Sequence, residues 1–453
     1  MKKRKIIKAG FICVLIFAVL FGIFEFYSQK TSKKIIDNFK FFELKNASFM
    51  NVKNPVETVS VSPYNPNTVY FFTSDGSLCS TEDGKTYKVL YKFENAEEPT
   101  VPDFRRVWIK PMKGGKVYVF LRKGKKTYVA YCDNDKNNWK ISVLNIPAYS
   151  VTESKINPEV VYIGTTSFCL HSYSSHLRGV VKLNLKMLYP EDYSFYKGFG
   201  FCEPVSVLCS DDKYVYYCLN DFVGLINRRP YRIKSLYESG QSLFLSPDRV
   251  KCMAVCKNSK GNDIIFATEK TGIIEKNLSN GEVKVLNKVA LKYSYGYPFD
   301  CPNLPSLSPF EKAVLYRKRV FRVYEDIPLN PVKIITDEKH EIAFLISENN
   351  FVFACNPNDE NPVWYPILLP EYYRKRLSPP HDWPVPVEGN LSCFELLKKK
   401  SFLGLNFRTV FRLDVEIKGI RRHINDATLS YKPYRLILAT NSGLAFITFK
   451  NLH

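Results

Sequence analysis

The chain has 453 residues, a formal net charge of +21 and an aromatic content of 15%, mostly Phe and Tyr. Aromatic and β-branched side chains fit half-buried strands, and a content of only five Met with little Ala argues against a helical protein. The positive charge says nothing about the fold. It points either to anionic partners, such as lipid headgroups, wall polymers or nucleic acid, or to a lysine-rich solvated surface.

The first predicted element is a membrane anchor. Residues 1–8 form a basic head, and residues 9–24 contain no charge and eleven Phe, Ile, Leu or Val residues. Residues 9–27 are long enough to span a bilayer and lack a small-x-small cleavage pattern. We therefore expect an uncleaved, single-pass anchor with a cytoplasmic N-terminus and an extracytoplasmic domain. Because lysines also follow the span closely, a cytoplasmic domain is the alternative.

Residues 28–55 are predicted to be a tether that ends in a strand. The C-terminal residues supply three strands and then stop, which would leave the last sheet with an unpaired edge. The apolar segment 40–49 is the natural donor of a fourth strand. We expect it to pair beside residues 444–449 and to join the two ends of the domain.

Residues 56–453 repeat a pattern of a β-rich run, a polar or Gly-containing turn and a second run, which is typical of hairpins. Four such hairpins start at residues 69, 117, 161 and 215, which are 44 to 54 residues apart. A period of this size suits a unit of four short strands. The predicted fold is an all-β propeller of about seven four-stranded blades, and stacked β-sandwiches are the alternative.

One turn carries a family resemblance. Residues 59–87 read VSVSPYNPNTVYFFTSDGSLCSTEDGKTY. This segment resembles the Asp-box, or BNR-type, repeat of sialidase-like, sortilin-like and photosystem-assembly-factor-like propellers, whose usual pattern is Ser-x-Asp-x-Gly-x-Thr-Trp. The matching positions are Ser80, Glu82, Gly84, Thr86 and Tyr87.

The resemblance implies a structural role for these residues. In such a turn a carboxylate and hydroxyls tie down the backbone, the glycine takes a left-handed conformation, and the aromatic ring packs underneath. Glu82 stands where the family has Asp, which is a departure, although Asp83 is adjacent. Later copies of the box have decayed, so the resemblance covers about 30 residues and only the architecture elsewhere.

We expect no catalytic, cofactor-binding or metal-binding residues. The chain contains no P-loop, dinucleotide fingerprint, GxSxG or HExxH motif. Sialidases carry an Arg-Ile-Pro element, but here Arg232 and Ile233 precede Lys234. An envelope glycosidase or lyase that uses the central pocket remains the alternative function.

The twelve cysteines contain no CxxC pair, and most of them interrupt apolar strands. We interpret them mainly as small buried hydrophobic residues, with one or two disulfides left open.

Basic side chains alternate with aromatic rings in two runs, which is a pattern that binds polyanions but that also fits an exposed strand. We interpret both runs first as solvated surface, and as candidate polyanion contacts they would suit a wall or lipid polyanion rather than nucleic acid. The candidate contacts are Arg317, Lys318, Arg319, Arg374, Lys375 and Arg376.

Residues 361–389 are rich in proline and aromatic residues, which predicts a long ordered loop. We interpret it first as a self-packed connector between blades, and its aromatic side chains are candidates for a partner surface in the other interpretation. The candidates are Trp364, Tyr365, Tyr372, Tyr373 and Trp383. We expect a membrane-anchored, non-catalytic module that binds a protein or an envelope polymer.

Overall fold

The structure is a computed structural model, and the part of the chain that it describes is all-β apart from a few N-terminal residues in helical conformation. The described residues are 16, 19, 20, 22, 37, 38, 41–94, 106–132, 138–155, 160–165, 180–184, 205–219, 222–227, 233–238, 249–258, 261–269, 271–292, 320–324, 331–348, 350–359, 362–370, 390–391, 394–402, 405–413, 417–420 and 423–452. Most of the predicted anchor, 9–27, lies outside them. Within them, no helix has both the length and the apolar character needed to cross a membrane.

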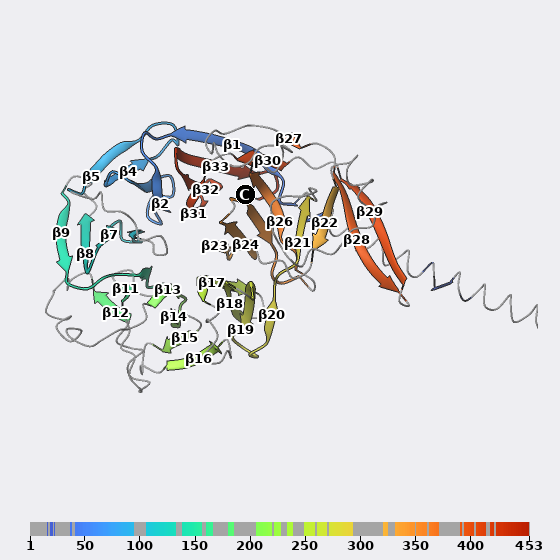
Figure 1. The fold of residues 1–453 in the computed structure, drawn as a ribbon. Helices are drawn as coiled ribbons and strands as arrows, with labels where there is room; N and C mark the ends of the chain where they lie inside the picture. The colour runs from blue at the N-terminus through green and yellow to red at the C-terminus, as the bar shows by residue number, and fades with distance from the viewer. Residues whose placement is uncertain are drawn as a thin grey trace, which may run out of the picture.

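Seven antiparallel sheets, which we number as blades 1 to 7, form a ring (Figure 1). Blades 1 and 2 contain β2 (Val56–Val61), β3 (Val69–Thr73), β4 (Ser77–Thr81) and β5 (Lys88–Lys92), then β6 (Val107–Pro111), β7 (Val117–Lys123), β8 (Lys126–Cys132) and β9 (Lys140–Leu144). Blades 3 and 4 contain β10 (Ser150–Glu153), β11 (Val160–Gly164) and β12 (Val180–Asn184), then β13 (Val205–Ser210), β14 (Tyr214–Leu219), β15 (Phe222–Asn227) and β16 (Ile233–Glu238). Blades 5 and 6 contain β17 (Val250–Asn258), β18 (Gly261–Thr268), β19 (Ile273–Asn277) and β20 (Val283–Val285), then β23 (Pro331–Asp337), β24 (Ile342–Ser347), β25 (Val352–Cys355) and β26 (Tyr365–Pro370). Blade 7 contains β31 (Ile424–Tyr431), β32 (Tyr434–Thr440), β33 (Gly443–Phe449) and the N-terminal β1 (Leu44–Asn51).

The first strands of the blades surround the centre of the ring. In order around it, β2, β6, β10, β13, β17, β23 and β31 each contact the next, and β31 returns to β2. Stacked sandwiches would not give this closed order. The all-β prediction is confirmed, and the described sheets form a β-propeller-like ring.

The ends of the ring meet in blade 7, as the sequence predicts. Strand β1 pairs antiparallel with β33, with Leu44 opposite Phe449 and Asn51 opposite Gly443. The strand begins and ends a few residues later than the predicted donor segment, 40–49. Beyond the pairing, the Lys450 ammonium lies 2.6 Å from the Glu43 carboxylate. The N-terminal strand therefore completes the C-terminal sheet and closes the ring.

Gly443 allows the tight start of β33. Its φ is +140°, and a Cβ at this position would lie 2.0 Å from the carbonyl oxygen of Met50. Any other residue would have to displace the backbone of β1, since the atom it meets belongs to the main chain.

The core is divided among the junctions between blades. Separate buried clusters lie between blades 7 and 1, 1 and 2, 2 and 3, 3 and 4, and 4 and 5, and the largest cluster joins blades 5, 6 and 7. Because each sheet is apolar on both faces, central strands such as β3, β11 and β24 are buried throughout. Each junction depends on both neighbouring blades, so the stability of the ring is shared along its circumference.

The cysteines in the described part of the chain behave as predicted from the sequence. All seven of them are free thiols, and six are buried. Burial raises the pKa of the Cys79 and Cys252 thiols to about 12. They therefore act as small hydrophobic residues at neutral pH.

One further sheet is not a blade of the ring. It contains β21 (Val289–Lys292), β22 (Val320–Tyr324), β28 (Phe394–Phe402) and β29 (Leu405–Leu413). Strands β22 and β28 pair in parallel, and the β28–β29 hairpin extends away from the ring (Figure 1). The short strands β30 (Ile417–Ile420) and β27 (Asn390–Leu391) extend blade 6 beyond β26. The pattern of hairpins in the sequence does not predict this sheet.

Candidate interaction face

The turns that follow β2, β6, β10, β13, β17, β23 and β31 lie on one side of the ring, which we call the inner-turn face. Contacts between strand ends establish this arrangement. The Lys110 ammonium lies 2.9 Å from the Glu153 carboxylate, which joins the ends of β6 and β10. At β17 and β23, the Thr336 hydroxyl donates to the Val255 carbonyl at 2.6 Å. Since the inner strands end together, their turns form a continuous surface.

Buried carboxylates hold two of these turns. Asp211 accepts hydrogen bonds from the backbone N–H groups of Lys213 and Tyr214 and from the Tyr216 hydroxyl, each at 2.6 Å. Burial, followed by the hydrogen bond to this carboxylate, raises the pKa of Tyr216. The phenol therefore remains a donor, and the turn after β13 is fixed at its base.

The turn after β23 repeats this construction. Asp337 accepts a hydrogen bond from the Lys339 N–H at 2.9 Å and another from the Tyr434 hydroxyl at 2.6 Å. It also lies 2.6 Å from Nδ1 of His340. Because Tyr434 belongs to β32, this carboxylate joins the turn of blade 6 to blade 7.

An ion-pair chain crosses blades 4, 5 and 6 at the inner-turn face. The Lys257 ammonium lies 2.9 Å from the Asp212 carboxylate and 3.7 Å from that of Glu338. The hydrogen bond from Lys257 lowers the pKa of Asp212, and the charges of Lys155 and Lys113 lower it further. These groups are partly solvated, so the pairs orient the turns more than they stabilise the fold.

The outermost part of this face combines lysines with tyrosines. Tyr64 and Tyr431 are 63% and 45% exposed, which is high for aromatic residues. They come from adjacent blades, 1 and 7, whose turns are linked by a hydrogen bond of 3.4 Å from the Ser430 hydroxyl to the Pro66 carbonyl. Exposed lysines come from the turns of five blades, namely Lys113, Lys155, Lys213, Lys339 and Lys432.

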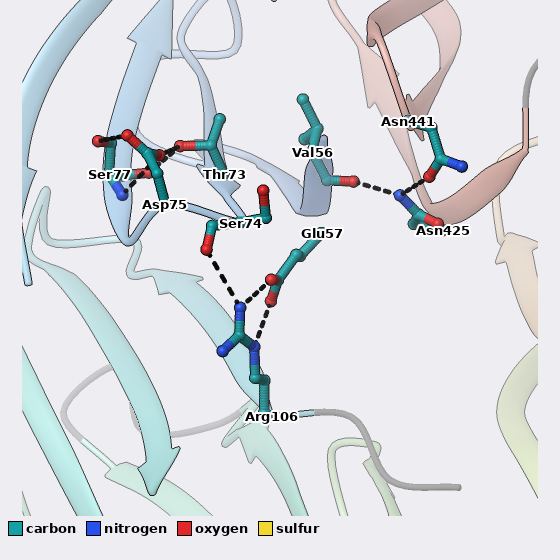
Figure 2. A network of polar contacts seen from close by, with 9 residues as sticks. All are labelled: Val56, Glu57, Thr73, Ser74, Asp75, Ser77, Arg106, Asn425 and Asn441. Carbon is teal, nitrogen blue, oxygen red and sulfur yellow. Dashed lines mark hydrogen bonds and ion pairs between the residues drawn. The ribbon is translucent and has the colours of Figure 1, made fainter. Parts of the chain in front are cut away.

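The opposite side of the ring is held by a different polar network (Figure 2). The Arg106 guanidinium binds both carboxylate oxygens of Glu57, with Nε 2.8 Å from Oε2, and also donates to the Ser74 carbonyl. Asn425 donates to the Val56 carbonyl at 2.8 Å and to Asn441. These contacts join blades 1 and 2, and blades 7 and 1, where the inner strands begin.

Nearby, a buried carboxylate joins three blades. Asp426 of β31 accepts hydrogen bonds from the Thr58 hydroxyl at 2.7 Å and from the Val59 N–H at 3.2 Å, both in β2. It also forms an ion pair with Lys333 of β23. We interpret Asp426 as a structural link between the inner strands of blades 6, 7 and 1.

Two further carboxyl groups are buried between blades 5 and 6. Asp263 of β18 and Glu275 of β19 are each 4% exposed, and the strand register makes them diagonal neighbours on one face of the sheet. Burial, then the charge of Asp263, raises the pKa of Glu275 to about 7. Two neighbouring buried carboxyl groups cannot both ionise without cost.

The predicted Asp-box residues form the turn between β4 and β5, with one correction. The carboxylate that ties down the backbone belongs to Asp83 rather than to Glu82. It accepts hydrogen bonds from the Lys85 N–H at 2.8 Å and from the N–H and hydroxyl of Thr86 at 2.9 and 3.0 Å. Donation from Thr86 and Lys85 holds the pKa of Asp83 well below its usual range.

The other residues of that turn have structural positions as well. Gly84 has a φ of +68°, and Ser80 lies in the buried strand β4. The Tyr87 ring packs edge-to-face on Phe71, with centroids 5.6 Å apart. The Thr81 hydroxyl, which the pattern does not include, accepts a hydrogen bond from the Gly84 N–H at 3.0 Å.

Two of the predicted partner-surface residues are in the core instead. Trp364 is 0% exposed and Tyr365 is 2% exposed. The Trp364 indole donates to the Leu286 carbonyl at 2.7 Å. Tyr365 begins β26, and Trp364, just before it, bridges to Val289 at the junction of blades 5 and 6, so neither residue is available to a partner.

The remaining predicted contacts lie outside the described residues: Tyr372, Tyr373, Trp383, Arg317, Lys318, Arg319, Arg374, Lys375 and Arg376. Within the described ranges, no group of three or more His, Cys, Asp or Glu side chains is arranged to hold a metal ion.

No protein-family model matches the chain, and no curated protein matches it either. Among solved structures, "Crystal structure of RRP9 WD40 repeats" is similar over 90% of this chain and 99% of the other, with 10% identity and a TM-score of 0.48. "Crystal Structure of Mitotic Checkpoint Complex" covers 90% and 95%, with 9% identity and the same score. The ring assignment rests on the strand pairing and contacts of this chain.

Proposed function

We propose that this chain is a non-catalytic protein-interaction scaffold that binds its partner through the inner-turn face. The observation that carries the proposal is the pair of exposed tyrosines, Tyr64 and Tyr431, within a set of exposed lysines on turns held by buried hydrogen bonds. Tyrosine is enriched at protein interfaces because it buries a large area at little cost in conformational entropy. Loops on a rigid scaffold commonly carry binding function.

The charge of this face selects the kind of partner. Lysines from five blades attract an acidic surface and accelerate its association at low salt. An acidic envelope polymer could use the same lysines, but it would make less use of tyrosine side chains. The importance of the two tyrosines therefore separates a protein partner from a polymer.

Capture from native membranes tests this function. We expect the purified chain to retain a defined protein, and Tyr64→Ser or Tyr431→Ser to weaken retention by about 30-fold, as for an interface hot spot. Val89→Ser is the matched control, because Val89 is 58% exposed on the outer strand β5 and lies away from the turns. Equal retention by all variants, or no retained protein, would contradict the proposal.

We also propose that residues 9–27 anchor the ring to a membrane, with the N-terminus cytoplasmic and the ring outside. The uncharged run supports this proposal. We expect the full chain to stay in the membrane pellet after alkaline carbonate washing. We also expect an added protease to cleave the ring in cells whose outer envelope has been made permeable while the membrane that carries the anchor stays intact. A chain that the wash releases would refute the anchor, and a protected ring would favour the cytoplasmic alternative.

The family resemblance belongs with these proposals. We propose that the turn at residues 80–87 is a diverged Asp-box, which the hydrogen bonds to Asp83 and the left-handed Gly84 support.

A further inference from the structure

Arg435 is partly buried and forms no ion pair within the described part of the chain. It lies on β32, and its guanidinium carbon lies 4.8 Å from the centre of the Phe446 ring. Burial lowers its pKa, and its Nε is buried with no hydrogen-bond acceptor in the described part of the chain. None of the acidic groups described there pairs with it. A guanidinium held in this way retains unused hydrogen-bonding capacity.

The surroundings of Arg435 place it at the junction of blades 7 and 1. Across the strand pair it lies opposite Ser430, whose hydroxyl donates to Pro66 in the turn after β2. On the other side, a Cβ on Gly84 would lie 3.2 Å from the Phe446 ring. Arg435 is thus flanked by two turns of blade 1, residues 62–68 and 82–87.

Those two turns supply exposed aromatic side chains. Tyr64 is 63% exposed and Tyr87 is 39% exposed. The carboxylate of Asp83, in the second turn, is occupied by hydrogen bonds within the turn. Arginine and tyrosine are the residues that most often dominate binding energy at protein interfaces, and here they lie at one blade junction.

We infer that Arg435 is the anchor for a carboxylate side chain of an acidic protein segment that crosses the junction of blades 7 and 1, with Tyr64 packing against that segment. This inference rests on the proposed function and names the group that the partner supplies. A guanidinium binds a carboxylate through two parallel N–H···O bonds. The guanidinium lies over the Phe446 ring, and partial burial strengthens the pair relative to one formed by an exposed lysine.

The test measures binding of a dye-labelled hexaglutamate peptide to the full chain by fluorescence anisotropy. We expect Arg435→Met and Arg435→Lys each to weaken binding about 10-fold, since lysine keeps the charge but loses the two-bond geometry. Tyr64→Ser, at a position that is 63% exposed, should weaken binding about 3-fold. Lys85→Met is the matched control: it removes an exposed charge from the neighbouring turn and should change binding by less than about 2-fold.

The inference would be overturned if the wild-type chain did not bind hexaglutamate, or if the Arg435 and Lys85 variants lost equal affinity. It would also be overturned if Arg435→Met lost as much affinity for oligothymidylate, which would indicate a phosphate site. Unchanged affinity of Tyr64→Ser for hexaglutamate would also contradict the inference, and this result does not depend on whether Arg435→Met folds. If Arg435→Met still captures the native partner as the wild type does, the anchor is wrong while the scaffold function stands.

Discussion

Replacing Asp426 by alanine is expected to lower the free energy of unfolding by about 3 to 5 kcal/mol, the range for breaking a buried ion pair. The Asp426 side chain is 1% exposed. Its removal leaves the Thr58 hydroxyl and the Val59 N–H without their buried acceptor and leaves Lys333 without its carboxylate. Urea denaturation of the purified chain, followed by tyrosine and tryptophan fluorescence, measures the loss.

Two further variants separate the charge from the hydrogen bonds. Thr58→Val removes a single donor and should cost about 1 kcal/mol. Asp426→Ala combined with Lys333→Met removes both charges, and it should be less destabilising than the sum of the single changes because residues in contact are coupled.

An exposed ion pair provides the control. Asp212 is 58% exposed in its pair with Lys257, so Asp212→Ala should cost at most about 1 kcal/mol. A similar cost for Asp426→Ala would show that Asp426 does not link the blades.

The sequence predicts the parts of this fold that depend on local pattern. Alternating apolar runs and polar turns define the strands, and the unpaired C-terminal sheet indicates that an N-terminal strand must complete it. Strand β1 does so. Closure follows because a sheet with an unpaired edge needs a partner strand, whereas the exact bounds of β1 are set by contacts that the edge alone does not determine.

The sequence does not predict contacts between distant turns. The ion pairs at the inner-turn face join three blades through Asp212, Lys257 and Glu338. The sequence around each of these residues predicts only an ordinary surface charge. One signal was available: an Asp, a second acid and a Lys occur in succession at 211–213 and again at 337–339. In both cases the first Asp holds the turn.

The aromatic segment near Trp364 shows why composition alone misleads. Prolines 366 and 370 disfavour a central strand, yet β26 contains both. An aromatic side chain fits a core as well as a partner surface. The residues around it determine whether such a side chain is buried or exposed. Here the indole of Trp364 is buried, and the Leu286 carbonyl accepts its hydrogen bond.

Glu275→Gln is expected to stabilise the chain above neutral pH and to have little effect in acid. Burial raises the pKa of Glu275 in the folded chain to about 7, above the ordinary value of 4.5 for this group. Folding therefore favours the protonated form of Glu275. The contribution of this group to the free energy of unfolding is greatest below about pH 4.5, falls as the pH rises to about 7, and stays low above that. The shift corresponds to an upper value of about 3 kcal/mol.

Several charged and titratable groups contribute to this pH dependence. The groups around Glu275 are Asp263 on β18, Lys284 and Glu282 on or beside β20, Cys256 on β17 and Cys355 on β25. Burial and Asp263 raise the pKa of Glu275, and Lys284 lowers it. Lys284→Met should therefore move the loss of stability to higher pH.

Urea midpoints of wild type and Glu275→Gln between pH 4.5 and 9 measure the difference directly. Glutamine resembles the protonated carboxyl group, since it keeps a donor toward Asp263 but cannot ionise. The variant and the wild type should have similar stability at pH 4.5, separate as the pH rises from 4.5 to about 7, and keep a constant difference above that. Glu82→Gln, at an exposed position in blade 1, removes a carboxylate that does not act on Glu275 and should follow the wild type throughout. If Glu275→Gln also runs parallel to the wild type at every pH, Glu275 is ionised in the folded ring, and the two carboxylates must be solvated or neutralised by cations rather than sharing a proton between blades 5 and 6.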